Sequence, residues 1–457
     1  MYKQALAGLT GIALTALLAT PAAADQWRDD QYWLDDYGFT TAWETSRGED
    51  VTVGIIDTGV DSTHQDLDGQ VVGGYDASGT GEADGTTPMG PDPTHGTQVA
   101  SLIAGHGHGD PPETEEDEDD SEDEDADEDS DDENTDDEAS DEPSEEPEEV
   151  APVDEYGTDG VLGTAPEVEL LSVSVLLDDT VEGVPSVDEQ IANGVTWLVD
   201  NGADVINISL ASQAQDWPTS WDDAFLHAEQ NDVVVVVAAG NRASGSDVVG
   251  APATIPGVLT VAGLEEGGSA SWDASTQGIT IGVAAPADPL IGAVPGDDYT
   301  QWSGTSGASP LVAGLAALIR SDNPDLSAPQ VINRILATAE DTGSAGDDNL
   351  YGRGIMDAEA ALTADVDTVS ENPMGSMEEW ITLHRRGEID ETDGQEEERE
   401  AAGPIDYPTE VPEAAPPEEE PAILQPIVII GFGVLLLSGV ATTIFMLRKR
   451  ATSQRNS

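Results

Sequence analysis

Three residues far apart in the chain carry side chains that could act together in nucleophilic catalysis. Asp57 lies in the segment IDTG, His95 in THGTQVA and Ser306 in GTSGASP. A serine hydroxyl becomes an effective nucleophile when a neighbouring imidazole removes its proton. The imidazole in turn needs a carboxylate that fixes its tautomer and stabilises the charge it acquires. The three residues are therefore a candidate nucleophile, base and orienting carboxylate.

The elements that would position these residues alternate along the chain. Short apolar runs predict buried strands at 51–56, 168–177, 204–210, 233–239 and 258–264. Helices are predicted between and after them, at 97–104, 187–201, 221–231, 306–320 and 328–339. Strands that are apolar along their whole length and alternate with helices indicate a parallel sheet covered on both faces. We therefore predict an α/β domain in which the three candidate residues meet at the carboxyl edge of the sheet.

The three motifs, in the order Asp, His, Ser, resemble those of the subtilisin-like serine proteases, or subtilases. The resemblance extends from Gln26 to about Leu362, with an acidic stretch as an insertion. It implies a subtilisin-like three-layer α/β domain with a mainly parallel sheet. It also implies hydrolysis of peptide bonds through an acyl-enzyme, with Asp57, His95 and Ser306 as the catalytic triad.

Two further segments match this family and suggest how substrate would be held. VAAGN at 237–241 resembles the segment whose asparagine stabilises the oxyanion, which would give Asn241 that role. A turn residue is the alternative for Asn241. The likeness also implies that the substrate backbone pairs as an added strand with residues 209–211, and that a substrate side chain enters a specificity pocket at residues 238–240. The residues so implied are Ser209, Leu210 and Ala211 for pairing, and Ala238, Ala239 and Gly240 for the pocket. Subtilases usually carry glycine at the position of Ala211.

The other histidines lack the flanking residues of His95. His64 lies on a segment that the family keeps for structure, and the remaining ones fall in a loop, a helix and the region near the carboxyl end (His106, His108, His227 and His384). Asp61 and Asp66 could bind calcium in some members of the family, but we predict no metal and no cofactor.

The net charge of the chain limits the classes of partner that it can bind. The formal net charge is −80, from 94 acidic and 14 basic residues. Nucleic-acid binding needs clustered Lys and Arg, so this charge argues against it. Such acidity would cause strong self-repulsion at low salt, which favours a halophilic source over a merely acidic exterior. The chain contains no cysteine, which excludes disulfides and thiol catalysis.

The two ends predict export and anchoring. Residues 1–24 contain Lys3, an apolar run and an Ala-x-Ala-like site, which is typical of a signal peptide. Residues 423–447 are almost wholly apolar and precede the basic cluster at 448–450, so they predict a membrane-spanning helix with a cytoplasmic tail at 448–457. The catalytic domain would then be extracytoplasmic on a single-pass cell-membrane protein.

Two segments have compositions that do not support a packed core. Residues 110–150 are rich in Asp, Glu, Ser and Pro and predict a disordered insertion, with calcium binding as the alternative. Residues 365–422 become acidic and then proline-rich, which predicts an extended stalk. The catalytic domain is therefore predicted at 25–109 and 151–364.

This arrangement resembles the mycosins, the membrane-anchored subtilases associated with type VII secretion. The shared features are a signal peptide, no room for a folded prodomain, an insertion after the histidine motif, a stalk and a carboxy-terminal span. DGVLGTAP at 159–166 adds to the likeness. The chain departs from mycosins in lacking cysteine and in carrying Gly307 and Ser309 beside the serine. The resemblance implies protein or peptide substrates and a type VII membrane complex as a partner. Two alternatives are a general surface protease of a halophile and a structural stabiliser of a secretion complex.

Overall fold

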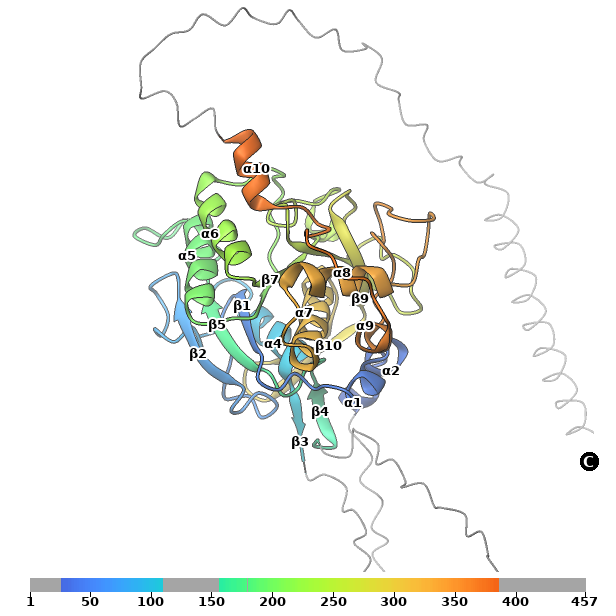
Figure 1. Ribbon diagram of the computed structural model, residues 1–457. Helices are drawn as coiled ribbons and strands as arrows, with labels where there is room; N and C mark the ends of the chain where they lie inside the picture. The colour runs from blue at the N-terminus through green and yellow to red at the C-terminus, as the bar shows by residue number, and fades with distance from the viewer. Residues whose placement is uncertain (1–25, 110–155, 179, 386–457) are drawn as a thin grey trace, which may run out of the picture. The chain divides into compact units, whose positions relative to one another are not determined.

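Seven parallel strands form the central sheet of the protein, in a computed structural model that describes residues 26–109, 156–178 and 180–385. The strand order is β2-β5-β1-β6-β7-β8-β9 (Figure 1). Their bounds are β1 Thr52–Asp57, β2 Val71–Asp76, β5 Glu169–Ser174, β6 Val205–Ile208, β7 Val234–Ala238, β8 Leu259–Glu265 and β9 Ile281–Asp288. Strands β6 and β7 are buried at every residue, which explains their uninterrupted apolar sequences.

Helices cover both faces of this sheet. On one face lie α5 (Val187–Asp200) and α6 (Thr219–Gln230), which pack on each other. Gly54 of β1 lies so close to α5 that a Cβ there would stand 2.7 Å from Leu198. On the other face, α4 (His95–Ala104) packs against α7 (Thr305–Asp322), and α7 contacts β6, β7, β8 and β9 (Figure 1). The α/β architecture with a parallel sheet between two helical layers is confirmed.

The predicted strands and helices all occur, within a few residues of their expected ends. Helix α5 begins at a capping box in which Ser186 and Glu189 bond reciprocally. Helix α8 (Ala328–Thr338) has the same device at Ser327 and Gln330. Strong local patterns therefore located these elements.

Several elements were not predicted, because their sequences are short or weakly patterned. Strand β2 is half-buried at the edge of the sheet and contains Gly73 and Gly74. Two antiparallel pairs also form, β3 (His106–His108) with β4 (Asp159–Leu162), and β10 (Leu290–Val294) with β11 (Asp298–Trp302). The short helices are α1 Gln26–Asp29, α2 Trp33–Asp36, α3 Phe39–Ala42, the 3₁₀ turn Arg242–Ser244, and α9 Ala358–Thr363.

The structure differs from the prediction where the stalk was expected to begin. Within 365–385, residues Met377–His384 form helix α10, which packs against α6, and Met377 is buried. The predicted signal peptide, insertion, membrane-spanning helix and tail, and residues 386–422 of the stalk, lie outside the described residues. Within residues 26–109, 156–178 and 180–385, no helix has the length and apolar character needed to cross a membrane.

Candidate active site

A buried carboxylate and a histidine are joined at the carboxyl end of β1. Asp57 is the last residue of β1 and His95 the first residue of α4. Their contact runs from His95 Nδ1 to Asp57 Oδ1 at 2.7 Å, with the Asp57 side chain 1% exposed and the His95 side chain 16% exposed. Because a carboxylate can only accept, His95 Nδ1 must carry the proton and Nε2 is left as the basic nitrogen. This is the orientation that a general base requires.

Glycine allows α4 to begin this close to β1. A Cβ on Gly96 would stand 2.2 Å from the carbonyl oxygen of Gly59, so no larger residue fits there. The backbone N–H of Gly96 donates to the Thr58 hydroxyl at 3.2 Å. The Thr58 N–H also donates to Asp57 Oδ1, at 2.7 Å. The residues that flank the two motifs therefore hold the pair in place.

Ser306 lies in the first turn of α7 and is half-buried. Trp302 of β11 meets the ring of His95 edge-on, with centroids 5.6 Å apart. A Cβ on Gly307 would stand 3.2 Å from the same indole, so Trp302 lies close both to the first turn of α7 and to His95. Among the described residues, no hydrogen bond joins Ser306 Oγ to His95. Such bonds are often long without substrate and shorten when substrate binds.

Asn241 is fixed beside the start of α7 with its amide nitrogen available. Its Oδ1 accepts from both the backbone N–H and the hydroxyl of Thr305, each at 2.9 Å. These bonds leave Nδ2 as the free end of the amide. Gly304 has a φ of 149°, and a Cβ there would stand 2.8 Å from Asn241 Nδ2. The free amide nitrogen of Asn241 therefore lies beside the start of α7, where it is a candidate oxyanion donor.

Burial and neighbouring charge act in opposite directions on His95. Burial lowers the pKa of His95, whereas the Asp57 carboxylate, its hydrogen bond and the charge of Asp92 raise it. The net result is a pKa above the ordinary value of 6.5. The carboxylate therefore favours the imidazolium that forms when the base takes a proton.

The residues expected to bind substrate lie at the ends of β6 and β7. Leu210 and Ala211 line a hollow of about 390 Å³, together with Trp221 and Asp188. Gly240 has a φ of 97°, and a Cβ there would stand 3.3 Å from the Cβ of Ala211. These two positions therefore face each other closely. Ala238 and Ala239 are buried behind Gly240.

Ser209 points inward and supports the nucleophile segment. Its hydroxyl donates to the carbonyl of Ser306 at 2.8 Å and lies 3.0 Å from the hydroxyl of Ser309. It also accepts from Asn207 Nδ2 at 2.9 Å. The side chain of Ser209 thus links β6 to α7, and only its backbone is left to pair with a substrate.

Residues 48–354 match the Subtilase family of peptidases. The chain is a subtilase. It is therefore a subtilisin-like serine endopeptidase, and its substrates are proteins. The predicted family and enzyme class are confirmed.

Relatives of this subtilase include two bacterial enzymes, subtilisin DY and fervidolysin. It is 35% identical to subtilisin DY of Bacillus licheniformis over 318 residues, which cover 69% of this chain and 92% of that protein. It is 27% identical to fervidolysin of Fervidobacterium pennivorans over 407 residues, covering 83% of this chain and 48% of fervidolysin. The subtilase thus spans about half of fervidolysin and most of subtilisin DY.

Solved structures similar to this subtilase include two from type VII secretion systems. MycP1 with its N-terminal propeptide removed matches with a TM-score of 0.52 and 28% identity, covering 74% of this chain and 98% of MycP1. The MycP3 protease of the ESX-3 system matches with a TM-score of 0.52 and 27% identity, covering 73% of this chain and 88% of MycP3. The resemblance to mycosins is thereby supported at the level of the fold.

Three residues of the site were missed by sequence reasoning. Trp302 packs on the imidazole, Thr305 holds Asn241, and Asp92 adds charge near His95. Thr305 directly precedes the candidate nucleophile, so the motif contained a signal for it. The sequence contained no such signal for Trp302 and Asp92, because their roles depend on how β11 and the loop before α4 are placed relative to His95.

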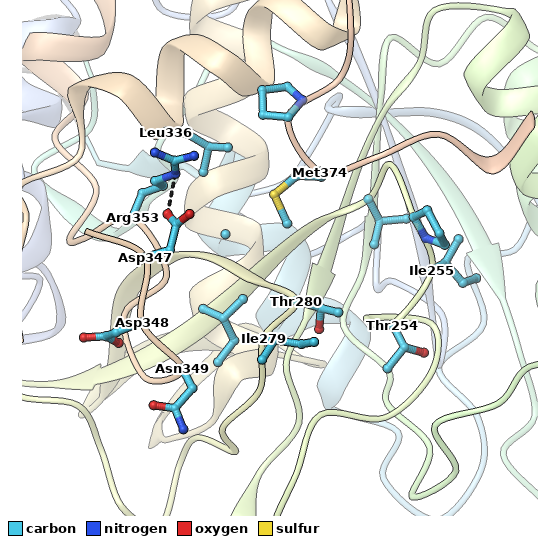
Figure 2. Close-up of a pocket in the computed structure, with 15 residues that line it drawn as sticks. Thr254, Ile255, Ile279, Thr280, Leu336, Asp347, Asp348, Asn349, Arg353 and Met374 are labelled. Carbon is cyan, nitrogen blue, oxygen red and sulfur yellow. Dashed lines mark ion pairs between the residues drawn. The ribbon is translucent and has the colours of Figure 1, made fainter. Parts of the chain in front are cut away.

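A second hollow, of about 360 Å³, lies away from these residues (Figure 2). It is bordered by Ile279, Thr280 and Met374, with an ion pair between Asp347 and Arg353 at its edge (Figure 2). None of the predicted site residues lines it.

Proposed function

We propose that this subtilase hydrolyses peptide bonds with Asp57, His95 and Ser306 as its catalytic triad. The 2.7 Å contact between His95 Nδ1 and Asp57 Oδ1 is the observation that supports this most directly. It leaves His95 Nε2 free to act as the base, and Ser306, in the first turn of α7, is the candidate nucleophile. Of the three Asp–His pairs among the described residues, only Asp57–His95 has the flanking residues of the subtilase motifs.

In the proposed reaction, Ser306 Oγ attacks the carbonyl carbon of the peptide bond while His95 Nε2 takes its proton. The resulting oxyanion would be stabilised by Asn241 Nδ2 and by the backbone N–H of Ser306. His95 then gives the proton to the leaving amine, which leaves an acyl group on Ser306. Water, deprotonated by His95, releases this acyl group in the second half of the cycle. Asp57 stays ionised throughout and stabilises the imidazolium.

Substitution of the nucleophile tests this proposal. Ser306→Ala should reduce kcat by at least about 10⁴-fold and leave the thermal unfolding of the protein unchanged. A fluorophosphonate probe should label Ser306 in the wild type, located by mass spectrometry, and should not label the variant. Ser303→Ala is the matched control, since Ser303 lies nearby on the chain but outside the proposed triad. Labelling that persists in Ser306→Ala would contradict the assignment.

We also propose that the protein is exported, held in the cell membrane by residues 423–447, and active with a type VII secretion system. The support is the sequence at the two ends together with the similarity to MycP1 and MycP3. Secretion should be lost in a deletion strain, and comparison with a Ser306→Ala strain separates proteolysis from a structural role. Secretion unchanged by deletion would favour a general surface protease instead.

A further inference from the structure

Helix α10 lies beyond the part of the chain that matches the family, yet it is bound at both ends to α6. The family match ends at residue 354, and α10 spans Met377–His384. At its start, Ser376 Oγ and the Met377 N–H both donate to the Glu229 carboxylate at 2.6 Å. Glu229 lies in the last turn of α6. Figure 1 shows α10 beside α6, at the edge of the domain.

At its other end, α10 reaches the first turn of α6. Arg385 Nε donates to Asp222 Oδ2 at 2.7 Å, and the Asp222 side chain is only 9% exposed. The indole N–H of Trp217 donates to the other oxygen, Asp222 Oδ1, at 2.9 Å. The rings of Trp217 and Trp380 lie 4.6 Å apart, and Arg385 stands over Trp380. A nearly buried carboxylate is thus neutralised by a cation supplied from α10.

The first turn of α6 is also a wall of the substrate hollow. Trp221, next to Asp222 in sequence, lines the hollow beside Leu210 and Ala211 and is 2% exposed. Its indole N–H donates to the carbonyl of Asp188, at 2.8 Å, and Asp188 lines the same hollow. Trp217 lies on the segment that joins Ala211 to α6. Whatever holds Trp217 and Asp222 therefore also holds the wall formed by Trp221.

We infer that α10, through Arg385 and Trp380, positions the α6 wall of this hollow and so sets how well it accepts large apolar side chains of the substrate. The inference rests on the proposed function, because it assumes that substrate passes Leu210 and Ala211. The lining is mostly apolar, including Leu177, Val187, Ile191 and Trp221. An apolar side chain is therefore the class that the hollow suits. Arg385 and Trp380 are positioning residues, since neither lines the hollow.

Arg385→Gln and Trp380→Ala test this inference by separating KM from kcat. The substrates are pairs of fluorogenic peptides that differ only by Phe or Ala at one of the four positions before the cleaved bond. The pair for which the wild type prefers Phe most strongly is then used with the variants. Both variants should raise KM for the Phe peptide about tenfold, with kcat and the Ala peptide unchanged. Amide hydrogen exchange should become faster at residues 211–222 and stay unchanged in α4 and α7.

A neutral double variant provides the rescue. In Asp222→Asn with Arg385→Gln, no buried charge is left unpaired, and Trp217 can still donate to the amide oxygen. KM for the Phe peptide should return towards the wild-type value. Arg353→Gln is the matched control, because it removes an arginine from an exposed ion pair with Asp347 and should change nothing.

Three results would overturn the inference in distinguishable ways. Unchanged KM and unchanged exchange in Arg385→Gln and Trp380→Ala would show that α10 does not position the wall. Equal losses for both peptides, with faster exchange extending to α7, would show that α10 only stabilises the fold. A wild type that cleaves no peptide and takes no fluorophosphonate label at Ser306 would remove the proposed function, and the inference with it.

Discussion

Two Asp–His pairs of almost the same geometry lie on the same domain. His95 Nδ1 is 2.7 Å from Asp57 Oδ1, and His108 Nδ1 is 2.8 Å from Asp66 Oδ1, with both carboxylates at most 1% exposed. Asp66 Oδ2 also accepts from the backbone N–H of Val161 in β4, at 2.8 Å. The second pair therefore ties β3 to β4, whereas the first pair joins the end of β1 to the start of α4.

The surroundings separate the two pairs. The ring of His108 stacks on Tyr299, with centroids 6.3 Å apart. The tyrosine hydroxyl lies 3.3 Å from His108 Nδ1. The ring of His95 instead meets the indole of Trp302, which also lies close to Gly307 in α7. Residue types and their distance do not by themselves make a catalytic pair, because the nucleophile and the charge-stabilising donors must also be present.

The largest expected effect comes from neutralising each carboxylate in turn. Asp57→Asn should lower kcat by about 10⁴-fold with little change in stability, because the imidazole loses its orienting partner. Asp66→Asn should leave kcat unchanged and lower the free energy of unfolding by about 1.5–3 kcal/mol. Peptide hydrolysis and denaturant unfolding measure the two effects. A folded Asp66→Asn protein without activity would contradict the assignment of a structural role to Asp66 and a catalytic role to Asp57.

Removing the amide donor should have the next largest effect. Asn241→Ala should lower kcat by about 10²–10³-fold with KM nearly unchanged, the range found when such a donor is removed from subtilisin-type sites. Asn333→Ala on α8 serves as the control. If kcat stays within a few-fold of the wild type, Asn241 is a turn residue and not an oxyanion donor.

A smaller effect is expected from the residue that holds Asn241. Thr305→Val keeps the shape of the side chain but loses the hydroxyl that donates to Asn241 and accepts from Gly240 at 2.9 Å. We expect kcat to fall about tenfold, less than for loss of the amide itself, because the bond from the Thr305 backbone remains. Thr305→Ser keeps the hydroxyl and should restore the rate. Equal rates in the two variants would argue against this positioning role.

The smallest expected effect is a shift in pH dependence. Neutral His95 is the active form, and its pKa is raised, so activity should rise with pH through a midpoint above the ordinary value of 6.5. The charge of Asp92 contributes to the raised pKa of His95. Asp92→Asn should therefore move the midpoint of the pH profile of kcat/KM to lower pH, by less than about one unit and more clearly at low salt. A midpoint that does not move, or moves up, would exclude the contribution of Asp92.

The same pKa has a consequence for stability. Because the folded pKa of His95 lies above that of an unfolded histidine, protonation of His95 stabilises the fold fully below the unfolded value. This contribution is lost as the pH rises through the folded value. The catalytically active form is therefore the less stabilised one. Asp57→Asn should reduce this pH dependence of the unfolding midpoint.

Much of the site could be predicted because its chemistry depends on residues that are neighbours in sequence. His95, Gly96 and Thr97 belong to one helix start, and Gly304, Thr305 and Ser306 to another. Each short segment contains both the reactive group and the small residues that its turn requires. Buried parallel strands such as β6 and β7 were equally clear, since burial on both faces demands apolar residues throughout.

Other features could not be predicted, because they depend on contacts between distant parts of the chain. Ser209 belongs to a strand end that resembled a substrate-binding segment, and only its contact with the Ser306 carbonyl shows that the side chain supports α7. The acidic composition after residue 365 predicted a stalk. The docking of α10 depends on Arg385 meeting Asp222, 163 positions earlier in the chain.

By itself, the sequence determined the α/β class, five of the buried strands with the longer helices that follow them, and the candidates for the reactive groups, since these follow from local composition, periodicity and short motifs. Only the tertiary structure decided that Asp66 pairs with His108, that Trp302 packs on His95, and that α10 docks on α6. The physical reason is that hydrogen bonds and packing between distant segments depend on distance and direction in space, which local patterns do not encode.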